Sequence, residues 1–156
     1  MYYQNKHHAR IYKERGFTIV ELLIIIITIG LLVGIFFTTF TDIGRKRRNS
    51  ERQQDVKTIQ HAIEDYYSQK ERYPSLAQIN DVNWRSKNIK SLSNDDITDP
   101  SSKQSALSPA PAAKVYSYAP ATTDGAPCDN VTLDCMKYVL TATQEDAEAY
   151  AKNNYN

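Results

Sequence analysis

The sequence predicts an α+β fold, in which a long N-terminal helix, transmembrane in its first half, packs against a small C-terminal antiparallel sheet. Three observations lead to this prediction. An unbroken apolar run occupies 17–40, apolar residues recur at helical spacing within 41–72, and two segments of 73–156 alternate between apolar and polar residues. At 156 residues, the chain has room for one ordinary domain and a short appendage.

The composition argues against several classes of protein. The formal net charge is +1, whereas a dedicated nucleic-acid-binding domain is strongly basic, which leaves nucleic acid as a low-ranked partner. The two cysteines and three histidines do not stand at the usual spacing of metal ligands. Neither a nucleophile paired with a base nor a phosphate-binding loop is visible in the sequence. We therefore expect neither enzymatic activity nor a metal or other cofactor.

The apolar run at 17–40 is long enough to span a membrane. It reads FTIVELLIIIITIGLLVGIFFTTF, and as a helix it would extend about 36 Å, against about 30 Å for the hydrocarbon core of a bilayer. A secretory signal peptide has a shorter apolar region followed by a small-residue cleavage site, which 38–41 does not offer. We expect a single-pass transmembrane helix that is not removed.

The orientation of this helix is not settled by counting basic residues. Lys6 to Arg15 flank one end and Arg45 to Arg48 flank the other, so the positive-inside rule does not choose between them. A lone cysteine pair in a polar C-terminal domain is most useful outside the cell, where a disulfide persists. We expect the chain in the cytoplasmic membrane, with the leader in the cytoplasm and the C-terminal domain outside.

Glu21 is the one charged residue in the apolar run. A carboxylate deep in a bilayer costs about 2.5 to 3.5 kcal/mol on insertion scales, which makes a functional role the default hypothesis. The alternative is that Glu21 lies near the interface and reaches the head groups.

The residues around Glu21 resemble a known signal. The sequence RGFTIVELL, from Arg15 to Leu23, is similar to the class III signal of type IV pilins and pseudopilins, in which a basic leader ends in glycine. The resemblance implies that prepilin peptidase cleaves between Gly16 and Phe17 and that the new amino group of Phe17 is methylated. It also implies that 1–16 is a cytoplasmic leader and that the C-terminal domain is a pilin-like head.

Cleavage would give Glu21 an assembly role. The freed amine of Phe17 would be a cation in apolar surroundings, and pairing it with a carboxylate offsets much of the cost of burying either charge alone. We expect Glu21 of one subunit to meet the amine of Phe17 on a neighbouring subunit. Pairing within one chain is the alternative geometry.

Gly30 and Gly34 form a G-x-x-x-G step inside the apolar run. Such a step lets helix backbones approach closely, which would suit packing in a filament core. The alternative is that glycine is generally frequent in transmembrane helices. The run also lacks the helix-interior proline that many family members carry, so the resemblance does not extend to local melting of the helix on assembly.

The helical pattern continues through 41–72 and ends at Tyr73-Pro74, because the residue before a proline is displaced from helical geometry. We expect one helix from Phe17 to Arg72. The apolar positions of its second half recur at steps of three, four and three residues and form a one-sided stripe. They are Val56, Ile59, Ile63 and Tyr66.

A basic cluster, Arg45 to Arg48 with Arg52, lies between the apolar run and this stripe. We rank a solvated or intersubunit charge cluster first and contact with anionic lipid head groups second. Nucleic acid ranks last, because no aromatic residues are interleaved to stack on bases.

Two strands, 114–119 and 136–143, are predicted to form an antiparallel hairpin. Both are rich in β-branched and aromatic residues, and Asp124-Gly125 between them is a turn signal. The sheet should take a third strand from 86–98 and cover the apolar stripe of the helix.

The remaining parts of 73–156 are predicted to be a loop-rich connector and a tail. We expect a short helix near 76–82 and either a short helix or a frayed tail over 143–155. The eleven tyrosines exceed what a small core needs, so some should be exposed.

Cys128 and Cys135 lie at the end of the hairpin loop. A bridge between them would close a short loop and contribute about 2 to 3 kcal/mol in the chain-entropy model. Two unpaired thiols are the alternative. A C-terminal disulfide loop is also a feature of the resembled family.

Six aspartates could supply oxygen ligands to calcium, as in a comparable loop of the major pseudopilins of type II secretion. No run among them matches an ordered calcium loop, so polar turn chemistry is the preferred interpretation. They are Asp95, Asp96, Asp99, Asp124, Asp129 and Asp134.

The resemblance implies a structural subunit of a type IV pilus-like surface filament that serves adhesion, motility or DNA uptake. Its expected partners are identical or related pilin subunits, the prepilin peptidase and methyltransferase, a pilus assembly platform and membrane lipid. One alternative is a pseudopilin of a type II secretion or competence system. Another, from a different class, is a membrane-tethered binding module that does not polymerise.

Overall fold

The computed structural model describes residues 16–155, except for the side chains of 37–40. Two compact units divide the chain, 1–41 and 42–156, which we call the first and second units. The leader residues 1–15 lie outside the described residues. The order of elements is one long helix, two short helices, one 3-10 turn and three strands, in agreement with the predicted α+β class.

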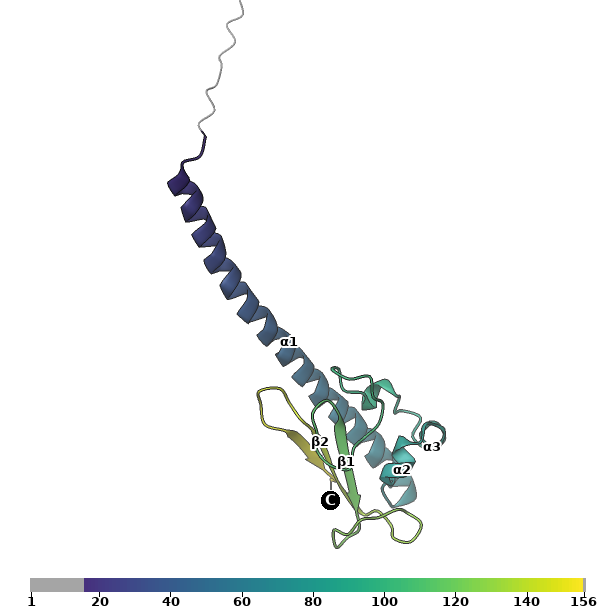
Figure 1. Ribbon diagram of the computed structural model, residues 1–156. Helices are drawn as coiled ribbons and strands as arrows, with labels where there is room; N and C mark the ends of the chain where they lie inside the picture. The colour runs from purple at the N-terminus through teal and green to yellow at the C-terminus, as the bar shows by residue number, and fades with distance from the viewer. Residues whose placement is uncertain (1–15, 156) are drawn as a thin grey trace, which may run out of the picture. The chain divides into compact units, whose positions relative to one another are not determined.

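One helix, α1, runs from Ile19 to Lys70 (Figure 1). Within the first unit, all residues from 16 to 36 are exposed, including long apolar side chains such as Leu22 and Ile29 at 55% and 54%. By length and composition, α1 is able to cross a membrane. The first unit therefore contains an apolar surface that its own described residues do not cover.

In the second unit, α1 forms one side of a packed core. Val56, Ile59 and Ile63 are completely buried and Tyr66 is nearly so, which confirms the predicted stripe. The helix ends where expected: Glu71 takes a left-handed conformation with φ 55°, and its backbone N–H donates to the carbonyl of Tyr67. This conformation closes the last turn before Tyr73-Pro74 redirects the chain.

Two short helices follow α1. They are α2, Leu76–Asn80, and α3, Val82–Asn88. Ser75 and Gln78 form a capping box at the start of α2, and the Asp81 carboxylate accepts from the backbone N–H groups of Asn83 and Trp84 at the start of α3. The prediction of one short helix is therefore refined to two, because Asp81 ends one helix and caps the next.

The sheet is antiparallel, with the order β1-β2-β3. β1 is Tyr116–Ala121, β2 is Lys137–Ala142 and β3 is Tyr150–Asn153. Tyr118 pairs with Leu140 in the hairpin, and Leu140 pairs with Lys152 of β3. Tyr118 and Leu140 are completely buried, and the sheet lies beside the second half of α1 (Figure 1).

The prediction of a third strand within 86–98 is wrong. Those residues form the end of α3, a turn and the 3-10 element η1, Asp95–Ile97. Leu92 and Ile97 of this segment are buried in the core, although the backbone around them is not a strand. The third strand of the sheet is β3, which lies within 143–155. A short helix or a frayed tail was expected for those residues. The β3 sequence Tyr-Ala-Lys-Asn carries little strand preference, so pairing with β2 determines its conformation.

Candidate functional site

The predicted cleavage position lies just before α1. Gly16, Phe17 and Thr18 are exposed and outside the helix. No described heavy atom lies within 4 Å of the position that a Cβ on Gly16 would take. The Gly16–Phe17 peptide bond is thus accessible in the part of the chain that the structure describes.

Glu21 takes part in the first turn of α1. Its backbone N–H donates to Thr18 Oγ1 at 3.2 Å, and its carboxylate Oε2 accepts from the Thr18 backbone N–H at 3.4 Å. This reciprocal arrangement is a capping box, which satisfies two backbone donors that a helix start leaves without partners. Sequence reasoning missed it, although the Thr-x-x-Glu spacing is its usual signal. The pairing of Glu21 with the amine of another subunit stays a prediction.

Gly30 and Gly34 lie on one face of α1. Apart from the neighbouring residues and the backbone of α1 itself, no described atom lies within 4 Å of either Cβ position, so both positions are open to an approaching helix. Packing of other helices against them stays a prediction as well.

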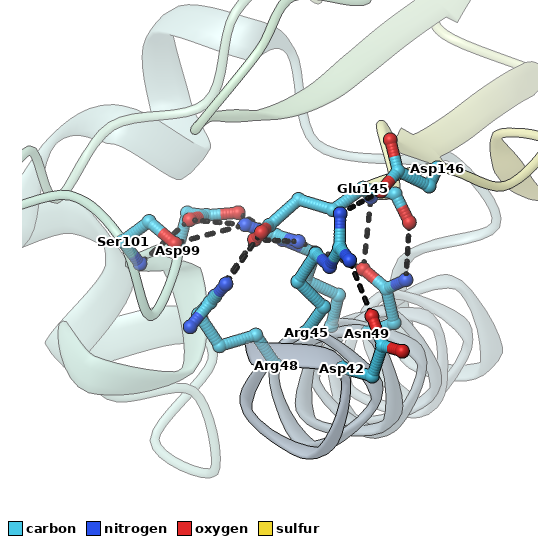
Figure 2. A network of polar contacts seen from close by, with 9 residues as sticks. Asp42, Arg45, Arg48, Asn49, Asp99, Ser101, Glu145 and Asp146 are labelled. Carbon is cyan, nitrogen blue, oxygen red and sulfur yellow. Dashed lines mark hydrogen bonds and ion pairs between the residues drawn. The ribbon is translucent and has the colours of Figure 1, made fainter. Parts of the chain in front are cut away.

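A polar network in the second unit joins α1 to two loops of the head. Three arginines project from α1 at positions 45, 48 and 52. They meet Asp99 in the loop after η1 and Glu145 and Asp146 in the loop between β2 and β3 (Figure 2). We call these residues, with Asp42, Asn49 and Ser101, the arginine network.

Arg52 is the centre of the network. Its side chain and that of Asp99 are each 2% exposed, and Nε donates to Asp99 Oδ2 at 2.7 Å. Nη2 donates to Asp99 Oδ1 at 3.2 Å and to Ser101 Oγ at 3.0 Å. Nη1 donates to Glu145 Oε1 at 2.9 Å and to Asn49 Oδ1 at 2.9 Å. The guanidinium is therefore buried with Asp99, and Glu145, whose side chain is 32% exposed, pairs with it from the edge of the network. A buried charge of this kind is stable when it is paired and hydrogen-bonded.

The carboxylate of Glu145 accepts hydrogen bonds from both Arg48 and Arg52. Arg48 Nε donates to Glu145 Oε1 at 2.7 Å, and Arg48 Nη2 donates to the second oxygen. The hydrogen bonds of Arg48, followed by those of Arg52, lower the pKa of Glu145 to about 2. Asn49 adds two contacts: its amide donates to the Glu145 carbonyl and accepts from the Glu145 backbone N–H. The loop between β2 and β3 is thus held through both side chain and backbone.

The first-ranked interpretation of the basic cluster, a solvated or intersubunit charge cluster, is wrong for Arg52, which is buried. Arg45 and Arg48 are 39% and 35% exposed and form ion pairs within the chain. Arg45 pairs with Asp42 and Asp146, and Arg48 and Arg52 pair as described above, so these charges are neutralised inside one chain. The signal that sequence reasoning missed is the i, i+3, i+7 spacing, which puts the three on one face of the helix. Lys46 and Arg47 are exposed.

The loop closed by the disulfide, 128–135, contacts the residues that follow the C-terminal end of α1. Cys128 and Cys135 are bonded, with Cα atoms 5.3 Å apart. The Tyr73 N–H donates to the Cys135 carbonyl at 2.7 Å. The Asn130 amide donates to the Tyr73 carbonyl at 2.7 Å and accepts from the Cys135 N–H at 2.8 Å. The disulfide therefore fixes the loop whose backbone and Asn130 side chain hydrogen-bond to Tyr73, just after α1 ends.

Three of the six aspartates considered as calcium ligands bind arginines or backbone N–H groups of the chain. Asp99 binds Arg52, Asp134 pairs with Arg72, and Asp129 accepts from the N–H groups of Val131 and Thr132. Within 16–155, no three His, Cys, Asp or Glu side chains are grouped so as to hold a metal ion.

Most of the described tyrosines are internal rather than exposed. Tyr73, Tyr116, Tyr118 and Tyr138 are at most 2% exposed, whereas Tyr155 is 61% exposed. Their hydroxyls have polar partners. Tyr138 and Tyr73 donate to Glu64, Tyr116 donates to Asp55, and Tyr118 donates to the Pro74 carbonyl. The excess of tyrosine thus builds a hydrogen-bonded core.

Two curated proteins are similar to this chain. The type IV major pilin protein PilA of Myxococcus xanthus is 32% identical over 65 residues, which are 42% of this chain and 30% of that protein. The type II secretion system core protein G of Pectobacterium carotovorum is 27% identical over 75 residues, 48% of each chain. No protein-family model matches the chain, and no solved structure matches it. The matches therefore span less than half of each curated relative.

Proposed function

We propose that the chain is a structural subunit of a type IV pilus-like surface filament, because it is similar to a type IV major pilin and to a core protein of a type II secretion system. In this proposal the chain is stored in the cytoplasmic membrane and polymerises with identical or related subunits through the first half of α1. Adhesion, motility and DNA uptake are the tasks open to such a filament.

The observation that carries the proposal is the exposure of the apolar residues of the first unit. Large side chains from Phe17 to Phe36 are between 42% and 86% exposed. An exposed apolar surface of this extent marks an interaction with a membrane or with other proteins. A bilayer can cover it before assembly, and the same residues of neighbouring subunits can cover it afterwards.

Maturation is proposed to begin with cleavage after Gly16. The support is that the Gly16–Phe17 bond is exposed and precedes the helix, as a bond must if a protease cleft is to bind it. Residues 1–16 would then be lost, and Phe17 would carry the methylated amino group. Cleavage would require prepilin peptidase as a partner, and polymerisation would require a pilus assembly platform.

Glu21 is proposed to change partner on assembly. In the single chain its carboxylate is 3.4 Å from the Thr18 backbone nitrogen, which is a long and therefore weak hydrogen bond. A charged amine from a neighbouring subunit would be a stronger partner, since it adds the attraction between two opposite charges, which is large in surroundings of low dielectric constant. Thr18 would keep its cap through Oγ1 and the Glu21 N–H.

A second candidate function, a pseudopilin of a secretion system, is favoured by the similarity to the type II core protein G, of which the match covers 48%. Such a subunit would use the same cleavage and the same apolar surface. It would differ in forming short assemblies rather than long surface fibres.

The test of maturation is the intact mass of the chain recovered from membranes, in the parent and in Gly16→Asp. We expect the parent to begin at Phe17 with one added methyl group, and Gly16→Asp to retain residues 1–16, because the added side chain obstructs the protease cleft. Gly125→Asp, the same substitution in the loop between β1 and β2, is the matched control and should be cleaved normally. A Gly16→Asp chain that is cleaved like the parent would contradict cleavage at this position.

A further inference from the structure

We propose that Lys46 and Arg47 bind the phosphate groups of anionic phospholipids at the membrane surface. The inference rests on the proposed function in one respect, namely that the first half of α1 is anchored in a membrane. It adds a binding site, a ligand class and two residues that the arginine network leaves unused.

The structure divides the basic cluster into two sets. Arg45, Arg48 and Arg52 are paired with carboxylates of the same chain. Lys46 and Arg47 are exposed, and within 16–155 the side chain of neither makes a hydrogen bond or an ion pair. Folding of the second unit therefore neutralises three cations of the cluster and leaves two adjacent ones available.

The two sets lie on different faces of α1. At about 100° per residue, Arg48 and Arg52 lie within about 60° of Arg45 around the helix axis, whereas Lys46 is about 100° away and Arg47 about 160° away. Figure 2 shows Arg45, Arg48 and Asn49 directed toward the loop of Glu145 and Asp146. The loop of Glu145 and Asp146 therefore covers the face opposite to Arg47. Lys46 lies at the edge of the covered face, where it lines a pocket with Glu145 and Asp146.

The position of Lys46 and Arg47 in the sequence fits the head-group layer. Lys46 follows Phe40, the last residue of the apolar run, by six positions, which is about 9 Å of helix. The polar layer on each side of the hydrocarbon core is about 5 to 7 Å thick. Lysine and arginine have long flexible stems that carry the charge toward the interface. Both cations can therefore reach lipid phosphates while the helix stands in the bilayer.

Lipid is favoured over other polyanions by the small size of the site. Two cations without interleaved aromatic residues provide little for a nucleic acid, which needs stacking platforms or many phosphate contacts. Each basic residue beside an anionic membrane surface strengthens binding about fivefold. Such contacts would hold stored subunits at the outer surface and would break when a subunit leaves the membrane for a filament.

The experiment uses the full chain in nanodiscs that contain phosphatidylcholine and phosphatidylglycerol. Native mass spectrometry after mild extraction measures the ratio of the two lipids that remain bound. We expect the parent to retain phosphatidylglycerol preferentially, and Lys46→Gln/Arg47→Gln to lower that ratio by at least about fivefold. Lys87→Gln/Lys90→Gln is the matched control, because it removes the same charge from exposed residues of the head, and it should keep the parent ratio.

Equal ratios in the parent and in Lys46→Gln/Arg47→Gln would overturn the proposal. If adding inorganic phosphate at constant ionic strength abolished the preference for phosphatidylglycerol, the site would be one for free phosphate. That result would overturn the lipid assignment. A variant that keeps its lipid ratio but is lost from filaments would assign the pair to a contact with a second copy. Failure of every variant to insert would contradict the membrane anchoring itself, which separates that result from failure of the lipid site alone.

Discussion

The two halves of α1 resemble each other in backbone and differ in what covers them. In the first unit, Ile25 and its apolar neighbours are exposed, whereas in the second unit Val56, Ile59 and Ile63 are completely buried by the head. A helix that is apolar all round must be covered from outside the chain, while a helix with one apolar stripe can be covered from within. The first half is therefore a surface that requires partners, and the second half is part of a finished core.

Removing the buried cation of the second unit should have the largest effect. Arg52→Met leaves Asp99 buried without its charge partner, and we expect a loss of about 3 to 5 kcal/mol in the free energy of unfolding. Fluorescence of Trp84, the one tryptophan of the chain, reports unfolding of the head in detergent. Arg52→Met/Asp99→Asn should recover part of the loss. An unchanged unfolding midpoint in the single variant would mean that the network does not stabilise the fold.

A matched pair of isoleucine truncations tests the comparison directly. Ile59→Ala removes a completely buried side chain and should cost about 2 to 5 kcal/mol. Ile25→Ala makes the same chemical change where the side chain is 42% exposed and should change unfolding of the head by less than about 0.5 kcal/mol. Equal losses from the two truncations would contradict the division of α1 into a covered and an uncovered half.

Opening the disulfide should have an intermediate effect. The bridge closes a loop with a sequence separation of 7, which corresponds to about 2 to 3 kcal/mol in the chain-entropy model. Cys128→Ser and added reductant should lower the melting temperature of the parent equally. Reductant should have no further effect on Cys128→Ser, and a parent that melts at the same temperature with and without reductant would rule out a contribution from the bridge.

Acid should weaken the second unit through Glu145. Its folded-state pKa of about 2 is below the ordinary value of about 4.3, so the stabilisation is complete above about pH 5 and is lost as the pH falls toward 2. Thermal unfolding between pH 7 and pH 2 should show a smaller decline in Glu145→Gln than in the parent. Parallel declines would show that Glu145 is not responsible for this pH dependence.

The sequence predicted those features that depend on local patterns. The uniform apolar run, the three-and-four spacing of Val56, Ile59 and Ile63, and Tyr73-Pro74 each specify the helix or its end within a few residues. The strands of the hairpin were also identified, since alternation and β-branched residues are local signals. The predicted bounds differ from β1 and β2 by one or two residues.

The features that were missed depend on contacts between distant residues. β3 has four residues with weak strand preference, and only its pairing with β2 makes it a strand. Arg52 lies 47 residues from Asp99 and 93 from Glu145, so the cluster appeared to be a charged surface until the fold brought the carboxylates to it. The cap between Thr18 and Glu21 is local, and the Thr-x-x-Glu spacing is sufficient to predict it.

The most direct test of the account is the composition of fibres sheared from the cell surface. Mass spectrometry would measure this chain in the fibres and in the membrane, in cells that express both the parent and Glu21→Gln. We predict fibres that contain the parent chain beginning at a methylated Phe17, with Glu21→Gln strongly depleted relative to its share of the membrane pool. Fibres without this chain, or a chain found only in membranes and still beginning at Met1, would contradict its role as a filament subunit.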